Sequence, residues 1–306
     1  MSAGHAAPPV LLLAFNRPDT TAQVLDAIRA GRPRQLFFAV DGPRDDRPDE
    51  RGQVAAVRAL ADTIGWDCEV RTLFRDRNLG CKLAVSQAVS WFFKQVELGI
   101  VLEDDCVAHP AFFRFTGELL QKYADDSRVA MISGDNFQFG RRRSEFSYYF
   151  SRYPHIWGWA SWRRAWQWYD HSMSRWPQLR DSGWLHELLG DHAAAAYWTR
   201  IFDETHADRN ASWAYRWTFA VWAHDGLSTL PGVNLVSNIG FGGGATHNRN
   251  RWNRFAALPL EEMRFPLVHP DNVVIDDEAD RFTQRTMFRR PWWRALAGNL
   301  LRAMRR

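Results

Sequence analysis

The chain has 306 residues, of which 46% are hydrophobic and 24% are charged. A chain of this length and apolar content can bury a large core, which excludes global disorder. The formal net charge of +4 comes almost wholly from Arg, and because these Arg residues form no aromatic-interleaved patch outside the C-terminal tail, we expect no nucleic-acid partner.

The first half of the chain alternates short apolar runs with amphipathic stretches. Apolar runs typical of buried parallel strands cover residues 10–15, Gln35–Val40, Glu69–Phe74 and 99–102. Between them we expect helices that end near Ile28, Leu60 and Phe93, the first of them capped by Asp19 or Thr20. This alternation predicts an α/β fold, Rossmann-like, with a mainly parallel sheet flanked by helices.

The second half is more helical and rich in tryptophan. The pattern predicts helices over residues 111–123, 162–169, 192–204 and 215–224, with strands over Val129–Ser133 and 230–237. Most of the 16 Trp residues lie between Trp157 and Trp222. Such a cluster fits either buried packing or a surface that faces carbohydrate or membrane.

Polar residues follow each of the first four predicted strands. They are Asn16 and Arg17, Asp41, the stretch 75–78, and Glu103 to Asp105. Because ligands of parallel α/β sheets bind outside the carboxyl ends of the strands, these residues predict a site at one edge of the sheet.

Three consecutive carboxylates, Glu103, Asp104 and Asp105, end the fourth strand. In an extended chain Glu103 and Asp105 would point to one side and Asp104 to the other. Oxygen ligands of this kind suit Mg²⁺ or Mn²⁺, and the ion could stabilise a diphosphate leaving group. The alternative is a set of solvated acids at the start of a helix.

The stretch VLEDDCVAHPAFFRF closely resembles the EDD region of N-acetylglucosaminyltransferase I, an inverting glycosyltransferase of the GT-A fold. The opening PPVLLLAFNRPDTTAQVLDAI and the Trp157-Gly158-Trp159 segment also resemble that family. RNLGCKLAV and NLVSNIGFG are similar to its bacterial relatives, the nucleotide-diphospho-sugar transferases. The resemblance covers roughly residues 8–250.

The resemblance implies a GT-A glycosyltransferase domain over residues 1–250, with a donor half over about 1–136 and an acceptor half over about 137–250. It implies Mn²⁺ or Mg²⁺ as cofactor and a UDP-sugar donor, with N-acetylglucosamine as the candidate sugar. The acceptor would be a glycan, a glycolipid or a lipid-linked saccharide, as in bacterial polysaccharide or lipopolysaccharide biosynthesis.

Individual residues take their expected roles from the same resemblance. Arg17 and Asp41 would contact the nucleotide, Asp41 near the base, and Arg77 and Asn78 would line the same pocket. Asp104 would reach the ribose or the donor sugar, Asp105 would ligate the metal directly, and Glu103 and Trp159 would belong to the donor site.

His247 follows the run Gly242-Gly243-Gly244-Ala245-Thr246. Glycine permits a backbone that moves, which suits a lid over a bound donor. Many GT-A enzymes use a late His as a second metal ligand, so the resemblance assigns His247 to the metal. The alternative is an exposed loop histidine.

The family places an Asp directly after a Trp as the general base, but here Ala214 follows Trp213. Three explanations remain open. The chain is a variant that has lost its base, another acid such as Asp225 replaces it, or the protein is a catalytically inactive nucleotide-sugar or glycan-binding pseudo-glycosyltransferase.

A sugar-1-phosphate nucleotidyltransferase is a rival within the same fold, but its first strand leads into a Gly-rich loop, whereas this chain has FNRPDT.

The N-terminus lacks the pattern of a signal peptide, no run of 18 apolar residues occurs, and Cys68, Cys81 and Cys106 have no disulfide or metal-ligand spacing. We therefore expect a cytoplasmic protein.

The C-terminal extension, residues 251–306, ends in a basic tail. From Arg281 onward the chain has no acidic residue, and Trp293, Leu296, Leu300 and Met304 fall near one helical face. That pattern is typical of a helix that lies on an anionic membrane surface, which would make the protein peripheral on the inner face of the cell membrane. A docked helix with a solvated Arg face is the alternative.

The membrane hypothesis predicts that the full chain co-sediments with anionic liposomes and that a chain cut after Asp280 does not, because the cut removes the basic amphipathic stretch. Equal binding of the two chains would remove the anchor hypothesis.

Overall fold

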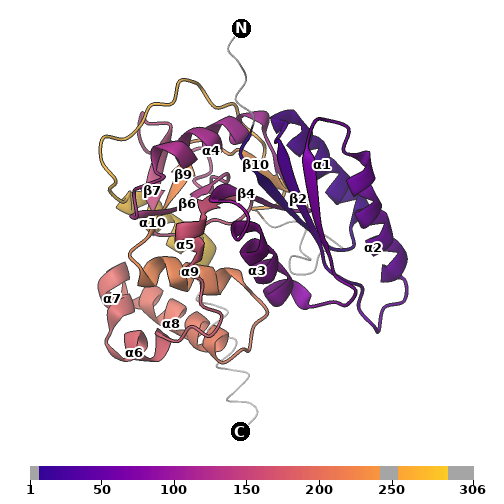
Figure 1. Cartoon of the computed structure of the whole chain (residues 1–306). Helices are drawn as coiled ribbons and strands as arrows, with labels where there is room; N and C mark the ends of the chain where they lie inside the picture. Colours follow the sequence, from indigo (N-terminus) through magenta and orange to yellow (C-terminus); the bar gives the residue numbers. More distant parts are fainter. Residues whose placement is uncertain (1–6, 242–253, 289–306) are drawn as a thin grey trace.

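The computed structural model of the chain describes residues 7–241 and 254–288. Within these residues eight strands form one mixed sheet in the order β3-β2-β1-β4-β8-β6-β9-β7 (Figure 1). The strands are β1 (Val10–Ala14), β2 (Gln35–Val40), β3 (Glu69–Phe74), β4 (Leu98–Glu103), β6 (Val129–Ser133), β7 (Tyr148–Ser151), β8 (Trp159–Trp162) and β9 (Leu227–Pro231). Strands β1 to β4 are mutually parallel, and β8 runs antiparallel between β4 and β6.

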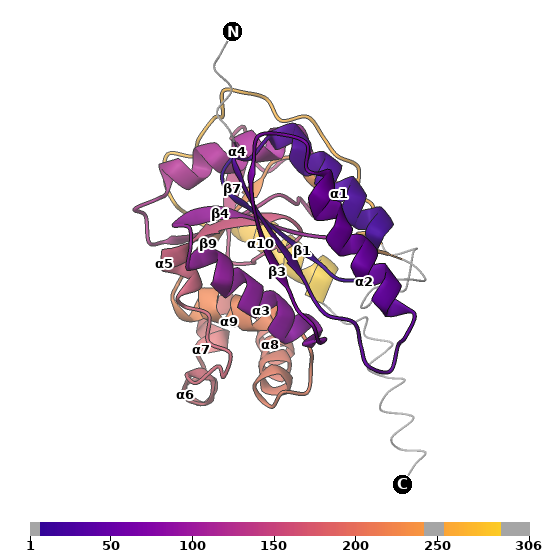
Figure 2. The same cartoon turned by 45° about the vertical axis from the view of Figure 1, so that its right-hand side comes forward.

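Helices cover both faces of the sheet (Figure 2). They are α1 (Pro18–Gly31), α2 (Glu50–Ala59), η1 (Leu60–Thr63), α3 (Gly80–Phe93), α4 (Pro110–Lys122), α5 (Arg163–Trp166), α6 (Trp176–Asp181), α7 (Trp184–Leu189), α8 (His192–His206), α9 (Ala214–Ala223), α10 (Asp277–Thr283) and η2 (Gln284–Phe288). The prediction of a mainly parallel sheet flanked by helices is confirmed.

The alternation of side chains along each strand separates two cores. On β1, Val10 and Leu12 belong to the core that includes residues of α1, α2 and α4, whereas Leu11 and Leu13 belong to the core that includes residues of α3, α8 and α9. Both faces of β1 are apolar because both are covered, which explains the continuous apolar run.

Several element boundaries differ from the sequence expectation. Helix α1 begins at Pro18 rather than after a cap at Asp19 or Thr20, because proline is suited to the first helical turn, and the Arg17 carbonyl accepts from the Thr21 amide. The stretch 162–169 was expected to be helical, but its first residue ends β8, and α5 is a single short turn.

The returning strand over residues 230–237 is in fact two strands. β9 ends at Pro231, and β10 (Val236–Asn238) pairs antiparallel with β5 (Cys106–Ala108) in a separate two-stranded sheet. The sequence did not predict β5, β7 or β8, which are only three or four residues long. Strands this short carry too little alternation to be recognised.

Most of the clustered tryptophans form core. Trp159, Trp162, Trp166, Trp176, Trp198, Trp213, Trp217 and Trp222 are all buried. Trp159 stacks on Trp213 with the ring centroids 5.9 Å apart. The buried-packing alternative therefore accounts for these side chains.

The described part of the C-terminal extension packs against the main body. Asp280 is buried and accepts hydrogen bonds from the Ser151 hydroxyl (2.5 Å) and the Arg152 amide (3.1 Å). A cut after Asp280 would therefore divide α10, and a cut after Phe288 is the better truncation for the liposome comparison. Among the described residues no helix has the length and apolar character needed to cross a membrane.

Candidate functional site

The carboxyl ends of β1 to β4 open into a cavity of about 550 Å³. In the strand order, β1 lies between β2 and β4, so the crevice between the β1 and β4 ends is the topological switch point at which α/β sheets bind ligands. The volume falls within the usual range for a small-molecule site. Of the site residues expected from the sequence, the cavity is lined by Asn16, Arg17, Asp41, Asn78, Glu103, Asp104, Asp105, Trp213 and Ala214.

Arg17 bridges the two aspartates that follow β4. Its Nη2 contacts a carboxylate oxygen of Asp104 and lies 2.8 Å from Oδ2 of Asp105. Burial would lower the pKa of Arg17, but the two carboxylates raise it overall. Asp104 and Asp105 do not point to opposite sides as an extended chain would require, because β4 ends at Glu103 and the chain turns there.

Asp105 is fixed by residues from the distant β10 segment. The Asn238 side-chain amide donates to Asp105 Oδ1 at 3.2 Å, and the Ile239 amide donates to the Asp105 carbonyl at 2.8 Å. A Cβ atom on Gly240 would lie 1.9 Å from Asp105 Oδ2, so a larger residue at this position would displace the Asp105 carboxylate. We call Glu103, Asp104 and Asp105 the acidic turn. The pairing of β5 with β10 brings residues 238–240 to this turn.

The acidic turn carries more negative charge than Arg17 neutralises. Burial, followed by repulsion from Asp105 and Asp104, raises the pKa of Glu103 to about 8. Burial also raises the pKa of Asp104 to about 6, although Arg17 opposes the shift. Both shifts have the same physical cause, since three carboxyls share one partly enclosed space.

The donor set fits a hard divalent cation that is held together with a phosphate-bearing ligand. Mg²⁺ is usually bound through one or two carboxylates plus substrate phosphates rather than by an all-protein cage. The residues in 7–241 and 254–288 contain no group of three or more His, Cys, Asp or Glu side chains placed to hold a metal. Asp105, whose side chain remains 13% exposed, is the candidate protein ligand.

The Asp41 carboxylate accepts hydrogen bonds from three backbone amides. Its oxygens accept from the amides of Gly42 (3.0 Å), Leu79 (3.0 Å) and Gly80 (3.1 Å), which fixes the loop that opens α3. Burial raises the pKa of Asp41, and these hydrogen bonds oppose the shift. Asn78 donates to the Gly42 carbonyl at 2.8 Å, so both residues also support the cavity floor.

Two of the predicted donor-site residues lie elsewhere. Arg77 is exposed and is not among the residues that line the cavity, and its backbone lies against Gly42. Trp159 lies in β8 with no exposed surface, behind Trp213, because its strand is inserted in the middle of the sheet. His247 lies outside the described residues.

Other lining residues were not singled out from the sequence. Arg44 lines the cavity beside Phe15, with its guanidinium carbon 5.6 Å from the ring centroid, and its Nε donates to Glu50 at 2.9 Å. Trp157 lines the opposite side and packs against Phe241. Arg44 lies in the loop over residues 42–50 (GPRDDRPDE), which follows β2 at the same edge of the sheet as the acidic turn, and this position is the signal in the sequence.

The wall that faces the acidic turn runs from Asn210 to Tyr215. Ala214 is the first residue of α9, so the expected base position does face the cavity. Asp225 is exposed and follows the other end of α9, roughly 16 Å away along the helix axis. The structure therefore contradicts Asp225 as the replacement base.

A buried pair, Asp135 and His155, lies beside the lining residues Ile156 and Trp157. Asp135 Oδ2 accepts from the Trp157 amide at 3.1 Å, and Asp135 Oδ1 lies 3.5 Å from His155 Nδ1. Burial raises the pKa of Asp135 to about 8 and lowers that of His155 to about 3. Between these values the pair holds one proton, whichever residue carries it.

No protein-family model and no curated protein matches the chain. Among solved structures, it is similar to 4-diphosphocytidyl-2C-methyl-D-erythritol synthase from Anaerococcus prevotii at 9% identity, with a TM-score of 0.35 over 73% of this chain and 88% of that one. It is similar to HddC from Yersinia pseudotuberculosis at 9% identity (TM-score 0.32, 51% and 77% covered). Its similarity to the inositol-1-phosphate CTP transferase from T. maritima is 8% identity (TM-score 0.32, 54% and 74% covered). Likeness this distant leaves the activity to be argued from the chain's own residues.

The buried pair predicts a pH dependence of stability. In the unfolded chain Asp titrates near 3.9 and His near 6.5, so above pH 6.5 the folded pair holds one proton more than the unfolded pair. The contribution of this pair to the free energy of unfolding should therefore fall by about 2 kcal/mol as pH rises from about 6.5 to about 8, and Asp135→Asn removes that contribution. Urea unfolding at both pH values would show this fall in the natural chain, and a smaller fall in Asp135→Asn. Equal falls in both proteins would contradict the assignment.

Proposed function

We propose that the chain is a metal-dependent GT-A glycosyltransferase that binds a UDP-sugar, with N-acetylglucosamine as candidate sugar, and transfers the sugar with inversion to a glycan, glycolipid or lipid-linked acceptor. The observation that carries the proposal is the pairing of cationic and acidic groups in one cavity at the switch point. Arg17 and Arg44 offer two guanidinium groups for a diphosphate, and the acidic turn offers carboxylates for the cation that accompanies it.

The two sides of the cavity suit different parts of the reaction. The strand-end side holds Asp41, Asn78 and the acidic turn, which suits the nucleotide and its diphosphate. The opposite wall from Asn210 to Tyr215 includes aromatic and hydroxyl side chains, which suits an acceptor saccharide. In the transfer, the acceptor oxygen forms a bond to the anomeric carbon, the bond from that carbon to the diphosphate breaks with its electrons on the nucleotide, and the hydroxyl proton needs a base.

Asp105 and His247 are the proposed protein ligands of Mn²⁺ or Mg²⁺. When bound, the ion would neutralise charge on the diphosphate. The support for Asp105 is its position in the acidic turn at the cavity lining, where its side chain is 13% exposed. The support for His247 is its position seven residues after Gly240, whose backbone lies against Asp105.

A binding protein without catalytic activity is the second candidate. The observation that favours it is Ala214, which presents a methyl group to the cavity at the position of the expected base. Such a protein would retain the strand-end side of the cavity and therefore its affinity for the nucleotide sugar. A bacterial setting, at the inner membrane face of polysaccharide or lipopolysaccharide synthesis, is proposed for either candidate.

The proposed metal site predicts that nucleotide affinity depends on the cation. Calorimetry with UDP-N-acetylglucosamine and Mn²⁺ should show binding that weakens at least about ten-fold on addition of EDTA and by a similar factor in Asp105→Asn, which removes one charge without changing shape. The matched control is Asp225→Asn, an exposed aspartate outside the cavity, which should bind as the natural chain does. Affinity that is indifferent to both EDTA and Asp105→Asn would refute the metal-dependent site.

Because Ala214 stands where a general base is expected, a carboxylate introduced at this position should raise the activity. Ala214→Asp should raise turnover of UDP-N-acetylglucosamine by at least ten-fold, because general-base assistance contributes about 10²–10⁴ in rate. The measurement is release of UDP in the presence of Mn²⁺, with water as acceptor. Ala214→Asn has the same shape without the basic carboxylate and should stay at the starting rate. No gain in Ala214→Asp, or an equal gain in both variants, would overturn the base position.

A further inference from the structure

A buried arginine organises the segment that forms the far wall of the cavity. Arg216, only 2% exposed, lies in α9 two residues after Ala214. Its Nε donates to the His171 carbonyl (2.8 Å), its Nη1 to the Ser212 carbonyl (3.1 Å), and its Nη2 to the Thr205 carbonyl (2.9 Å). One guanidinium thus joins α9, the end of α8, the segment 207–213 and the loop that contains residue 171.

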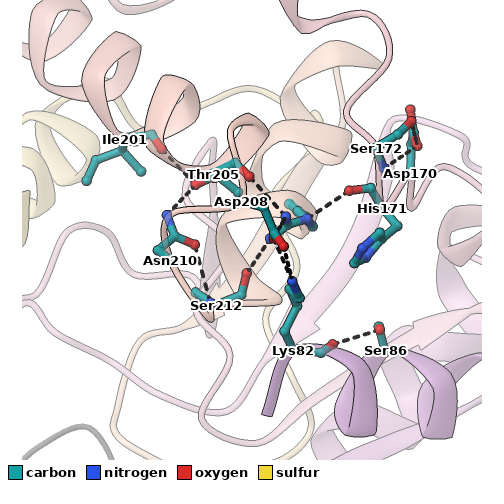
Figure 3. Close-up of polar contacts among 11 residues, drawn as sticks. Lys82, Ser86, Asp170, His171, Ser172, Ile201, Thr205, Asp208, Asn210 and Ser212 are labelled. Carbon is teal, nitrogen blue, oxygen red and sulfur yellow. Dashed lines mark hydrogen bonds and ion pairs between the residues drawn. The ribbon is translucent and has the colours of Figure 1, made fainter. Parts of the chain in front are cut away.

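The same guanidinium meets Asp208, which links the wall to α3. Arg216 Nη2 donates to Asp208 Oδ1 at 2.9 Å, and Lys82 Nζ lies 2.5 and 2.7 Å from the two Asp208 oxygens (Figure 3). Asp208 has φ of 56°, a left-handed conformation that Asp tolerates better than most residues. Lys82 follows Cys81, which lines the cavity on the α3 side.

The two halves of this arrangement differ in exposure and therefore in strength. The Arg216 side chain is 2% exposed and satisfied by fixed carbonyls, so releasing it would leave a buried charge without partners. The Lys82 and Asp208 side chains are 19% and 57% exposed, so this pair is weak and screened by salt. Asn210 and Ser212 add local bonds, from Asn210 Nδ2 to the Thr205 hydroxyl (2.7 Å) and from the Ser212 amide to Asn210 Oδ1 (3.3 Å) (Figure 3).

We propose that Lys82, Asp208 and Arg216 form a positioning clamp that holds the segment 207–213, and with it the wall from Asn210 to Tyr215, against α3. Arg216 is buried and bound to backbone carbonyls, so it fixes the shape of the segment. The Lys82–Asp208 ion pair is more exposed and can break, and it joins the two sides of the cavity. Release of this pair would let the wall move away from α3, so the clamp governs how fast a ligand enters and leaves. This last consequence rests on the proposed function.

Hydrogen–deuterium exchange of the segment 207–213 tests the clamp without any ligand. In Lys82→Met, exchange of this segment should rise about two- to five-fold, the scale of an exposed ion pair, while Lys82→Arg should keep the natural rate. High salt should raise the exchange in the natural chain and leave Lys82→Met unchanged, because only the natural chain has the pair to screen. The matched control is Lys94→Met at the other end of α3, which should not alter this segment.

The outcomes separate the clamp from the proposed function. If exchange in Lys82→Met equals that of the natural chain, or if Lys94→Met raises it equally, the clamp is overturned. A second arm measures the dissociation rate of UDP-N-acetylglucosamine with Mn²⁺, which should rise in Lys82→Met by a similar factor. If UDP-N-acetylglucosamine binds but its dissociation rate does not rise in Lys82→Met, the gating role is overturned. If the natural chain does not bind it at all, the proposed function is contradicted, and the exchange result alone decides the clamp.

Discussion

The concentration of negative charge at the end of β4 is the constraint on which the rest of the site depends. Glu103, Asp104 and Asp105 are contiguous and largely enclosed, which is unfavourable without compensating cations or hydrogen-bond donors. Arg17, placed by the first turn of α1, supplies one cation to the two aspartates. The β10 segment supplies the Asn238 amide and the space beside Gly240. The neighbouring strands β1 and β4 and the two-stranded sheet therefore converge on this turn.

The cavity is built from two kinds of structure with different stability. The strand-end side rests on parallel strands that are hydrogen-bonded and covered on both faces. The facing wall is a segment between α8 and α9 that depends on side-chain bonds, above all those of Arg216. Ligand-binding proteins commonly combine a rigid platform with a less stable wall, because one part sets geometry while the other admits the ligand.

Buried polar groups at and beside the cavity also serve its geometry. Asp41 binds the amides that open α3, and Asp135 binds the Trp157 amide. Burial raises the pKa values of both carboxyl groups. Their hydrogen bonds to backbone fix the two loops whose side chains then line the cavity, so these two carboxyl groups have a structural role.

The sequence by itself determined the strands β1 to β4, the alternation with helices and the polar residues at the strand ends, because these features follow from local periodicity and from parallel connection. It also placed Ala214 after Trp213, where the structure has the start of α9 at the cavity wall. Only the tertiary structure decided which of these residues face the cavity. It turned Asp104 and Asp105 toward one guanidinium, buried Trp159, left Arg77 outside, and brought Asn238 to Asp105 across 133 residues of sequence. Contacts of that separation depend on how strands and loops pack, and no local pattern of side chains encodes them.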